Sequence, residues 1–291
     1  MKMADQRTIR VFPRRTNATP TDALAVSRLP ELFDEADKVH VSVAFEWDLP
    51  LADRLAKEWE AVGPVEVGGP ATGGVPGEFE PGKYLRMGYT ITSRGCPNTC
   101  WFCQAWRKEG EIRLLAIREG YNVLDNNLLA CPAHHIVRVF EMLERQAERP
   151  RFTGGLEAKR LLPWHVEWLA RLRPEVAWFA YDTPDDWGPL CDGASMLEDA
   201  GLITGKHRIG CYVLIGWPGD TIDKAEKRLR KVVSIGLFPQ AMLLDAGKYV
   251  GDVREWKRFA REWSSKVIVG AKMRKYRESP SPLSEIREIR G

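Results

Sequence analysis

Two apolar runs decide the fold class of this chain: Glu175-Val-Ala-Trp-Phe-Ala-Tyr181 and Arg208-Ile-Gly-Cys-Tyr-Val-Leu-Ile215. Each run is short and ends at a turn, Asp182-Thr-Pro after the first and Gly216-Trp-Pro-Gly after the second, as is typical of buried strands. Between them, residues 195–200 have helical spacing, and Gly201 is suited to end a helix. A strand, a helix and a second strand in this order predict a βαβ unit.

The same order of strand, loop and helix repeats through the central part of the chain. Six strands alternating with helices predict an α/β fold, specifically a partial (β/α)6 barrel, in which functional residues gather at the C-terminal strand ends. The further predicted elements are strands at residues 89–93, 121–125, 151–153 and 239–244, and helices at residues 134–147, 163–172, 221–235 and 253–263.

The first 80 residues predict a small α/β unit of their own. Asp48 is the expected N-cap of its second helix, and Pro50 lies in the first turn of that helix. A stretch dense in Gly and Pro, residues 68–77, marks the boundary to the barrel. The elements expected in this unit are strands at residues 8–12, 38–45 and 64–67, and helices at residues 22–37 and 49–61.

The predicted domains are therefore residues 1–80, the barrel at residues 81–250, and a C-terminal helix with a basic tail at residues 251–291. From Lys272 onward the chain is basic and then rich in Pro and Ser, which favours a solvated or frayed tail over a phosphate-binding segment.

Composition limits the class of protein. Lys and Arg number 43 against 40 Asp and Glu, a net charge of +3, which by itself indicates neither a nucleic acid nor an acidic membrane as partner. No run approaches 18 apolar residues, and the N-terminus lacks the apolar core of a signal peptide, so we expect a cytoplasmic protein without a membrane span. Six Cys are too few for a secreted disulfide scaffold.

Three of the six thiols are clustered. Cys96, Cys100 and Cys103 have the spacing C-x3-C-x2-C, with Gly95 giving the loop backbone freedom and Pro97 stiffening its turn. Iron–sulfur clusters are normally held by four thiolates, so a cluster held by three leaves one iron open to another ligand. Zinc is the rival metal, but no His lies within thirty residues of the group, and a structural zinc site needs four ligands.

This spacing, with the aromatic Phe102 directly before the last Cys, resembles the signature of the radical S-adenosylmethionine (radical SAM) enzymes, and the resemblance covers about residues 89–245. It implies that Cys96, Cys100 and Cys103 hold a [4Fe–4S] cluster whose open iron chelates SAM. It implies further that SAM is cleaved reductively to methionine and a 5′-deoxyadenosyl radical, which abstracts a hydrogen atom from a substrate. The electron would come from a low-potential donor of the flavodoxin or ferredoxin type.

The resemblance also implies SAM contacts outside the loop. The run Phe152-Thr-Gly-Gly-Leu-Glu157 resembles the Gly-Gly-Glu motif that meets the SAM amino group, with Leu156 where Glu is usual and Glu157 one residue later. The run from Gly210 to Asp220 resembles the segment that flanks the adenine. Outside the Cys residues, the expected cofactor contacts are Phe102, Asn126, Gly154, Gly155, Glu157, Asp182, Leu214 and Gly216. Asn126 and Asp182 are equally suited to be N-cap or turn residues.

Catalytic residues are not fixed by the resemblance. Tyr181 is a candidate for hydrogen bonding to SAM or substrate, and Cys131 or Cys211 for donating a hydrogen atom to a product radical, although Tyr and Cys are both commonly core residues. Loops containing Trp101, Trp106, Trp187 and Trp217, with the basic tail, favour a nucleoside or other small molecule as substrate and leave nucleic acid open. The alternative is an iron–sulfur or zinc-binding module without SAM chemistry.

The N-terminal unit carries a second resemblance. Gly68-Gly-Pro-Ala resembles the end of the cobalamin-binding domain that precedes the barrel in one branch of radical SAM enzymes. The Asp-x-His-x-x-Gly signature of cobalamin binding is absent, because His40 lacks that context, and the unit is short. We therefore expect a degenerate unit that does not bind cobalamin.

Overall fold

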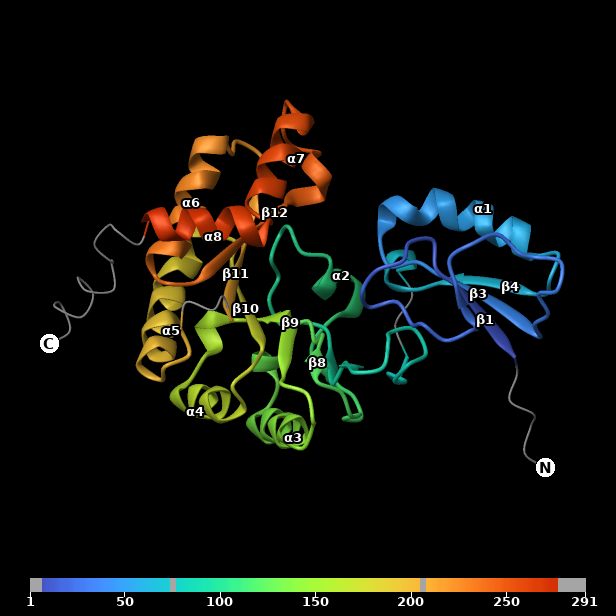
Figure 1. Cartoon of the computed structure of the whole chain (residues 1–291), viewed down its shortest axis with the longest axis horizontal. Coiled ribbons are helices and arrows are strands. Elements are labelled where there is room, and N and C mark those ends of the chain that lie inside the picture. Colours follow the sequence, from blue (N-terminus) through green and yellow to red (C-terminus); the bar gives the residue numbers. More distant parts are fainter. Residues whose placement is uncertain (1–6, 74–76, 205–207, 277–291) are drawn as a thin grey trace, which may run out of the picture. The chain divides into compact units, whose positions relative to one another are not determined.

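The computed structural model describes residues 7–73, 77–204 and 208–276 (Figure 1). The chain forms two compact units, the first comprising Met1–Thr99 and Cys103–Gly120 and the second Cys100–Phe102 and Tyr121–Gly291. Both units are built on parallel sheets covered by helices, which confirms the α/β class. No helix among the described residues combines the length and the apolarity that crossing a bilayer requires.

The first unit contains a four-stranded sheet in the order β2-β1-β3-β4, with every pairing parallel. Helix α1 (Leu49–Trp59) packs on it, and its Trp59 is completely buried beside Val39 and Val41. The indole nitrogen of Trp59 donates a hydrogen bond to the carbonyl oxygen of Arg28 at 3.1 Å. The strands are β1 (Thr8–Val11), β2 (Ala25–Val26), β3 (Lys38–Ser42) and β4 (Val65–Gly68).

Arg10 on β1 is a buried cation, with 8% of its surface exposed. Its guanidinium is paired with the carboxylate of Asp22 and donates to the carbonyl oxygens of Lys83 and, at 3.1 Å, Gly82. Three acceptors satisfy a group that would otherwise be costly to bury. These bonds attach residues 82–83 to the first sheet.

The predicted helix at residues 22–37 is wrong: this segment forms β2 and a series of turns. Asp34 accepts hydrogen bonds from the backbone nitrogen of Glu31 and from Arg28, and such side-chain contacts compete with a helix. The apolar spacing was misleading because Leu32 and Phe33 are 89% and 88% exposed.

Asp48 stands at the N-cap position of α1, with Pro50 in the first turn as predicted, but the Asp48 side chain does not cap the helix. Both of its carboxylate oxygens instead accept hydrogen bonds from Arg14, at 2.9 and 2.8 Å. The N-cap role predicted for this side chain is therefore wrong, because a bidentate charged partner is the stronger competitor.

The second unit contains five parallel strands in the spatial order β12-β11-β10-β9-β8, so strands that follow one another in sequence are neighbours. A helix follows each strand. The strands are β8 (Asn122–Val123), β9 (Arg151–Leu156), β10 (Val176–Tyr181), β11 (Ile209–Ile215) and β12 (Phe238–Leu243). The helices are α3 (Ala133–Glu144), α4 (Pro163–Leu172), α5 (Trp187–Asp199), α6 (Ile222–Ser234), α7 (Val253–Glu262) and α8 (Lys266–Tyr276).

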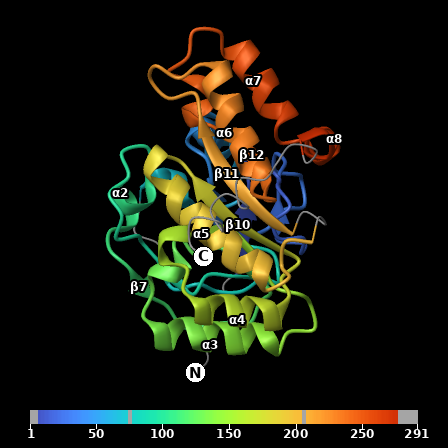
Figure 2. The same ribbon diagram turned by 90° about the vertical axis from the view of Figure 1, so that its left-hand side faces the viewer.

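Alternation along the strands gives this sheet two different faces. On one face, Phe179, Cys211 and Val213 are at most 1% exposed, and helices α5 and α6 pack on the strands that carry these residues. Helices α3 and α4 lie side by side (Figure 2). On the other face Trp178 stacks on Tyr212 with ring centroids 4.6 Å apart. Met242 on β12 is 43% exposed.

Helix α3 ends at Glu144 rather than at residue 147, and α5 differs from the prediction at its start. Helix α5 begins at Trp187 rather than at residue 195, because Gly188 and Pro189 fall in its first turn, where missing backbone donors are tolerated. Its end is as predicted, and the backbone nitrogen of Gly201 donates to the carbonyl oxygen of Glu198 at 2.8 Å.

The prediction of a frayed tail from Lys272 is wrong as far as residue 276, because α8 continues to that point. Val269 and Met273, one helical turn apart, are 0% and 2% exposed. The ammonium of Lys272 lies 4.4 Å from the ring centre of Trp263. The remainder of the predicted tail lies outside the described residues.

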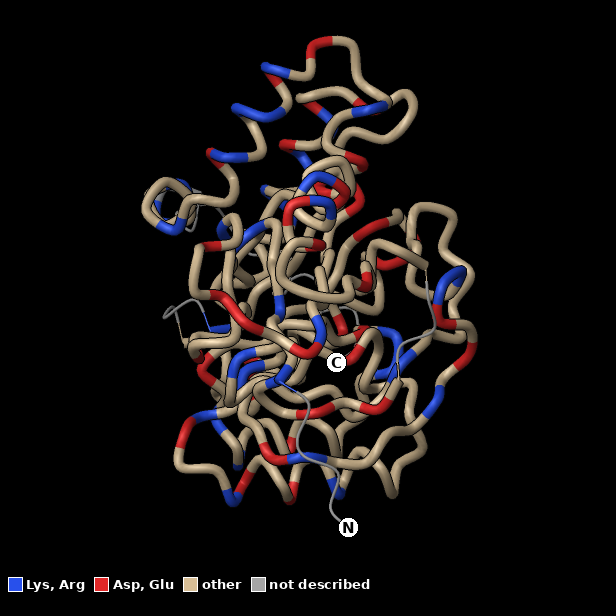
Figure 3. Tube along the Cα trace, turned by 90° about the vertical axis from the view of Figure 1, so that its right-hand side faces the viewer, with Lys and Arg blue, Asp and Glu red and all other residues tan. Residues whose placement is uncertain are grey.

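The predicted strand at residues 89–93 is divided into β5 (Tyr89–Thr90) and β6 (Ser93–Arg94), and β6 pairs antiparallel with β7 (Arg113–Leu114). Helix α2 (Ala105–Glu109) lies between them in sequence. Single 3-10 turns occur at Glu46–Asp48, Pro70–Thr72, Leu128–Ala130, Ala158–Arg160, Pro184–Asp186 and Leu244–Gly247. Lys and Arg are interspersed with Asp and Glu along the trace (Figure 3).

Candidate functional site

The three clustered thiols lie in the loop that joins β6 to α2. Cys96, Cys100 and Cys103 are all half-buried and reduced. The backbone nitrogen of Cys96 donates to the carbonyl oxygen of Gly110 at 3.0 Å. Glu109 binds the start of the loop as well, with one oxygen accepting from the Gly95 nitrogen at 3.1 Å and the other from Arg94 at 3.2 Å. These hydrogen bonds thus join the C-terminal end of α2 to the start of the loop.

Gly95 is required by this closure. Its φ is +82°, and a Cβ added to it would lie 2.1 Å from the carbonyl oxygen of Glu111. Only glycine takes up this conformation and this close approach without strain. The backbone freedom that the sequence suggested for Gly95 is therefore confirmed.

We expect Gly95→Ala to move the loop, lowering the free energy of unfolding by about 1–3 kcal/mol and reducing iron retention after reconstitution by roughly tenfold, because the thiols shift with the backbone. The measurements are thermal unfolding and iron per chain. Gly110→Ala is the matched control: its φ is +72°, but nothing lies within 4 Å of the added Cβ. Equal iron loss in both variants would contradict the argument.

Two aromatic residues stand between the second and third Cys. Phe102 is half-buried, and its ring meets that of Trp101 edge-on with centroids 5.5 Å apart. Trp101 is itself 50% exposed. Aromatic groups beside thiolates limit access of water to a bound metal group, which affects its reduction potential.

At the end of β9, glycine permits an approach between two chain segments. A Cβ on Gly154 would lie 2.3 Å from the carbonyl oxygen of Asp125, in the segment after β8. Beside it, nothing lies within 4 Å of the position of a Cβ on Gly155. The pairing of β9 with β10 is irregular at this point. The predicted Gly-Gly site is therefore a strand end that is packed on one side and open on the other.

Glu157 is held against the same segment. Its Oε2 accepts from Nδ2 of Asn127 at 2.6 Å and from Nε of Arg160 at 2.7 Å. The structure thus brings together Gly154, Glu157 and the residues after β8, as the sequence predicted for the ends of neighbouring parallel strands.

Asn126 and Asp182 do not cap helices. The N-cap residues nearest them in the chain are Asn127, Pro132, Thr183 and Asp186. Oδ1 of Asn126 is buried and has no hydrogen-bond partner among the described residues. An unsatisfied buried acceptor costs about 1–3 kcal/mol, so this oxygen is suited to meet a donor on a ligand.

Asp182 follows β10, and burial raises the pKa of its carboxyl from 3.8 to about 7, helped by the neighbouring Asp186. Asp186 is the charged member of the pair, because Lys159 lies 3.0 Å from it and Thr183 donates to it. With its pKa raised, the protonated carboxyl of Asp182 can donate as well as accept a hydrogen bond.

This shift predicts a pH dependence of stability. Because the folded state holds the Asp182 proton up to about pH 7 and the unfolded state only to about 3.8, the free energy of unfolding falls as pH rises between these values. In Asp182→Asn this decrease in the free energy of unfolding should be smaller by on the order of 2 kcal/mol. Thermal unfolding at pH 5 and pH 8 measures it, with exposed Asp185→Asn as control. Equal pH slopes for wild type and Asp182→Asn would refute the assignment.

Leu214 and Gly216 lie at the end of β11. Leu214 is 7% exposed, and its carbonyl oxygen accepts from Arg228 at 3.3 Å. The nitrogen of Gly216 donates to Asp220 at 2.8 Å. Asp220 in turn pairs with Arg228 at 2.6 Å, so a buried ion pair fixes the turn that follows this strand.

Tyr181 and Cys211 are core residues of the helix-covered face. Tyr181 is 4% exposed and packs on Trp187, with ring centroids 5.4 Å apart. Cys211 is fully buried, and burial raises the pKa of its thiol well above its usual value. These surroundings favour packing roles for both residues.

Cys131 lies in a group that the sequence did not predict. Among the described residues, Asp125, Cys131 and His135 form a group of three potential metal ligands whose atoms lie within 4.8 Å of one another. The signals were present in the strand end at residue 125 and in the helical spacing of Cys131 and His135, but no pattern joins the three. The loop Cys residues do not form such a single-ion group; a cluster binds each thiolate to a different iron.

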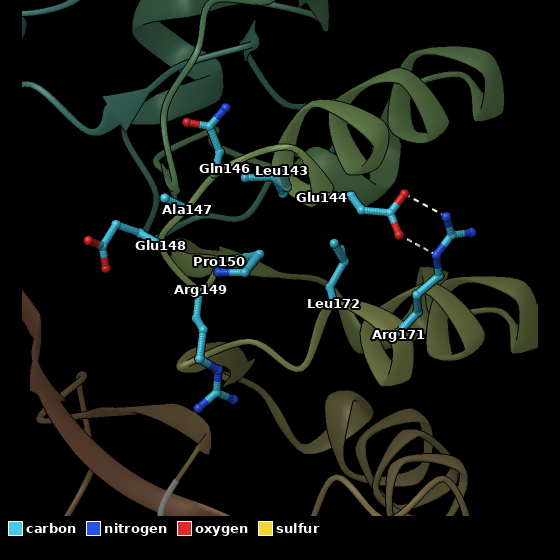
Figure 4. Close-up of a pocket in the computed structure, with 9 residues that line it drawn as sticks. All are labelled: Leu143, Glu144, Gln146, Ala147, Glu148, Arg149, Pro150, Arg171 and Leu172. Carbon is cyan, nitrogen blue, oxygen red and sulfur yellow. Dashed lines mark hydrogen bonds and ion pairs between the residues drawn. The ribbon is translucent and has the colours of Figure 1, made fainter.

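A small hollow of about 140 Å³ lies where α3 and α4 end and β9 begins (Figure 4). Glu144 and Arg171 form an ion pair at its rim. It stands at the N-terminal ends of the strands, the side on which parallel α/β folds rarely place their chemistry.

The chain was also compared with known proteins. It matches no protein-family model and no curated protein.

Proposed function

We propose that this protein is a radical SAM enzyme, with the second unit as part of a partial (β/α)6 barrel. The observation that carries the proposal is the C-x3-C-x2-C loop with its three half-buried, reduced thiols. Five consecutive parallel strands, each followed by a helix, support the barrel. A [4Fe–4S] cluster with SAM would supply reductive cleavage of SAM and a radical able to take a hydrogen atom from a substrate.

The donor set fits these groups. Three thiols within eight residues suit an iron–sulfur cluster, and the closure at Gly95 and Glu109 holds the loop that carries them. In the proposal Cys96, Cys100 and Cys103 bind the cluster, and Phe102 with Trp101 limits water access.

At the strand ends, the orphaned Oδ1 of Asn126 and the open side of Gly155 support SAM binding. In the proposal, Oδ1 of Asn126 and the carbonyl oxygens of Gly154 and Gly155 accept hydrogen bonds from donor groups of SAM. Asp182 forms a hydrogen bond with a hydroxyl or an amino group of SAM. Glu157 orients the Asn127 amide. Leu214 and Gly216 supply backbone beside the adenine. In this proposal these residues would bind and orient SAM, and their hydrogen bonds would stabilise one pose.

The protein's partners follow from the same proposal: a low-potential electron donor of the flavodoxin or ferredoxin type, and a small molecule or nucleoside as substrate. Trp101, Trp187 and Trp217 are not fully buried and favour a planar substrate, because bases stack on such rings.

Anaerobic reconstitution tests the proposal. We expect a brown protein with about four irons per chain that forms 5′-deoxyadenosine from SAM when dithionite is added. A colourless protein that binds one zinc and leaves SAM intact would refute the proposal and support the alternative, a metal-binding module without SAM chemistry. A protein that binds iron but does not cleave SAM would support an electron-transfer module. The substrate is then found by following deuterium from labelled candidates into 5′-deoxyadenosine.

A further inference from the structure

A second site stands apart from the Cys loop in sequence and chemistry. Asp125 lies two residues after β8, Cys131 directly follows a 3-10 turn and His135 lies in the first turn of α3. Their exposed fractions are 1%, 6% and 4%. Their potential ligand atoms all lie within 4.8 Å of one another. A carboxylate, a thiol and an imidazole thus converge on one point inside the second unit.

The backbone fixes this convergence. The nitrogen of Cys131 donates to the carbonyl oxygen of Leu128 at 3.0 Å, and that of His135 to Pro132 at 2.9 Å. Leu128, 1% exposed, lies in the turn between the first two ligands. Three groups held by main-chain turns in a dry environment do not need large rearrangement to bind an ion, so the site is formed in advance.

The donor set selects the kind of ion. Thiolate and imidazole favour zinc and similar divalent transition metals, whereas calcium and magnesium take oxygen ligands. Zinc sites accept Cys, His and Asp in tetrahedral geometry.

We propose that Asp125, Cys131 and His135 bind one divalent transition-metal cation of the zinc type. The carboxylate, the thiolate and an imidazole nitrogen are its three protein ligands. The fourth tetrahedral position goes to water or another oxygen donor, as in zinc sites with three protein ligands. This site does not depend on the proposed SAM chemistry, because it uses none of the loop thiols.

Cobalt binding tests the site in the full chain. Cys96, Cys100 and Cys103 are replaced by Ala, so that the loop cannot bind metal, and the chelator-treated protein is titrated with Co²⁺ alone. We expect one Co²⁺ per chain, visible bands of tetrahedral cobalt and a near-ultraviolet band from thiolate-to-cobalt charge transfer. One equivalent of Zn²⁺ should remove these bands.

Single substitutions assign the ligands. Asp125→Asn and His135→Gln should each weaken cobalt binding at least 100-fold, and Cys131→Ser should abolish the charge-transfer band. His134→Ala is the matched control, because His134 is the exposed neighbour of His135 on α3, and Cys191→Ser controls for a buried thiol elsewhere. Both controls should bind cobalt as the parent does. Circular dichroism verifies that each variant is folded.

Several outcomes would overturn the proposal. They are a parent protein that binds no Co²⁺, bound cobalt without a thiolate band, or folded ligand variants that bind as tightly as the His134→Ala control. Any of these would leave Asp125, Cys131 and His135 as a buried group that binds no metal. None of them bears on the Cys loop, whose iron content is measured separately in the chain with Cys96, Cys100 and Cys103 intact.

Discussion

Cys100→Ala is expected to lose the iron centre. After anaerobic reconstitution it should retain less than ~10% of the iron of the wild type and form no 5′-deoxyadenosine above background, because two thiolates cannot hold a cluster that needs at least three. The effect should be equally complete for Cys96→Ala and Cys103→Ala. Iron and sulfide per chain, the absorbance of the brown protein and dithionite-dependent cleavage of SAM are the measurements.

Cys191→Ala is the control for this experiment. Cys191 lies on α5, is 3% exposed, and burial raises the pKa of its thiol to about 11, so it has the surroundings of a packing residue. Its variant should keep its iron and cleave SAM. If Cys100→Ala retained the iron of the wild type, the loop would not be the metal site and the proposed function would fall with it.

The second large effect concerns the ion pair of Asp220 and Arg228. The Asp220 side chain is fully buried and lies 2.6 Å from the guanidinium of Arg228, which is 11% exposed and stands over the Trp217 ring. Asp220→Ala should therefore cost about 3 kcal/mol, because it leaves a buried cation without its charge partner. In a unit of this size that lowers Tm by roughly 10 °C.

Two further variants separate charge from volume. Asp220→Ala combined with Arg228→Met should recover part of the lost stability, since no unpaired charge remains. Glu226→Ala breaks a more exposed ion pair on the same helix as Arg228. Glu226 is 27% exposed and its partner Arg230, 3.0 Å away, is 50% exposed, so a loss of only a few tenths of a kcal/mol is expected. Thermal unfolding that ranked Glu226→Ala with Asp220→Ala would contradict this account.

The elements that could be predicted are those whose signal is local. Helix α4 has the predicted bounds. Strands β10 and β11, each an apolar run between turn residues, differ from the prediction by one residue. The errors arise where a residue far away in the sequence determines the local structure. Arg14 binds the carboxylate of Asp48, and the folded chain buries Met273 in a segment that was predicted to be a solvated tail.

The residues of the candidate site likewise divide into those with a local sequence signal and those without one. The loop thiols are recognisable from their spacing and Gly154 from its place at the end of a predicted strand, whereas Glu157 was predicted only from the resemblance to the Gly-Gly-Glu motif. The approach of Asp125, Cys131 and His135 could not be predicted, because it depends on the 3-10 turn at Leu128–Ala130 and on where α3 begins. No pairwise spacing among those three residues is distinctive in one sequence.

Arg10 has a practical consequence for dissecting the chain. A recombinant fragment cut at residue 80, where the composition changes, would lose the carbonyl groups of Gly82 and Lys83 and leave the buried guanidinium with Asp22 alone. A fragment that extends through residue 120 keeps these acceptors together with β6, α2 and β7. Work on the isolated N-terminal portion should start from the longer fragment, because the shorter one lacks two acceptors for a buried cation and would be less stable than the same residues are in the full chain.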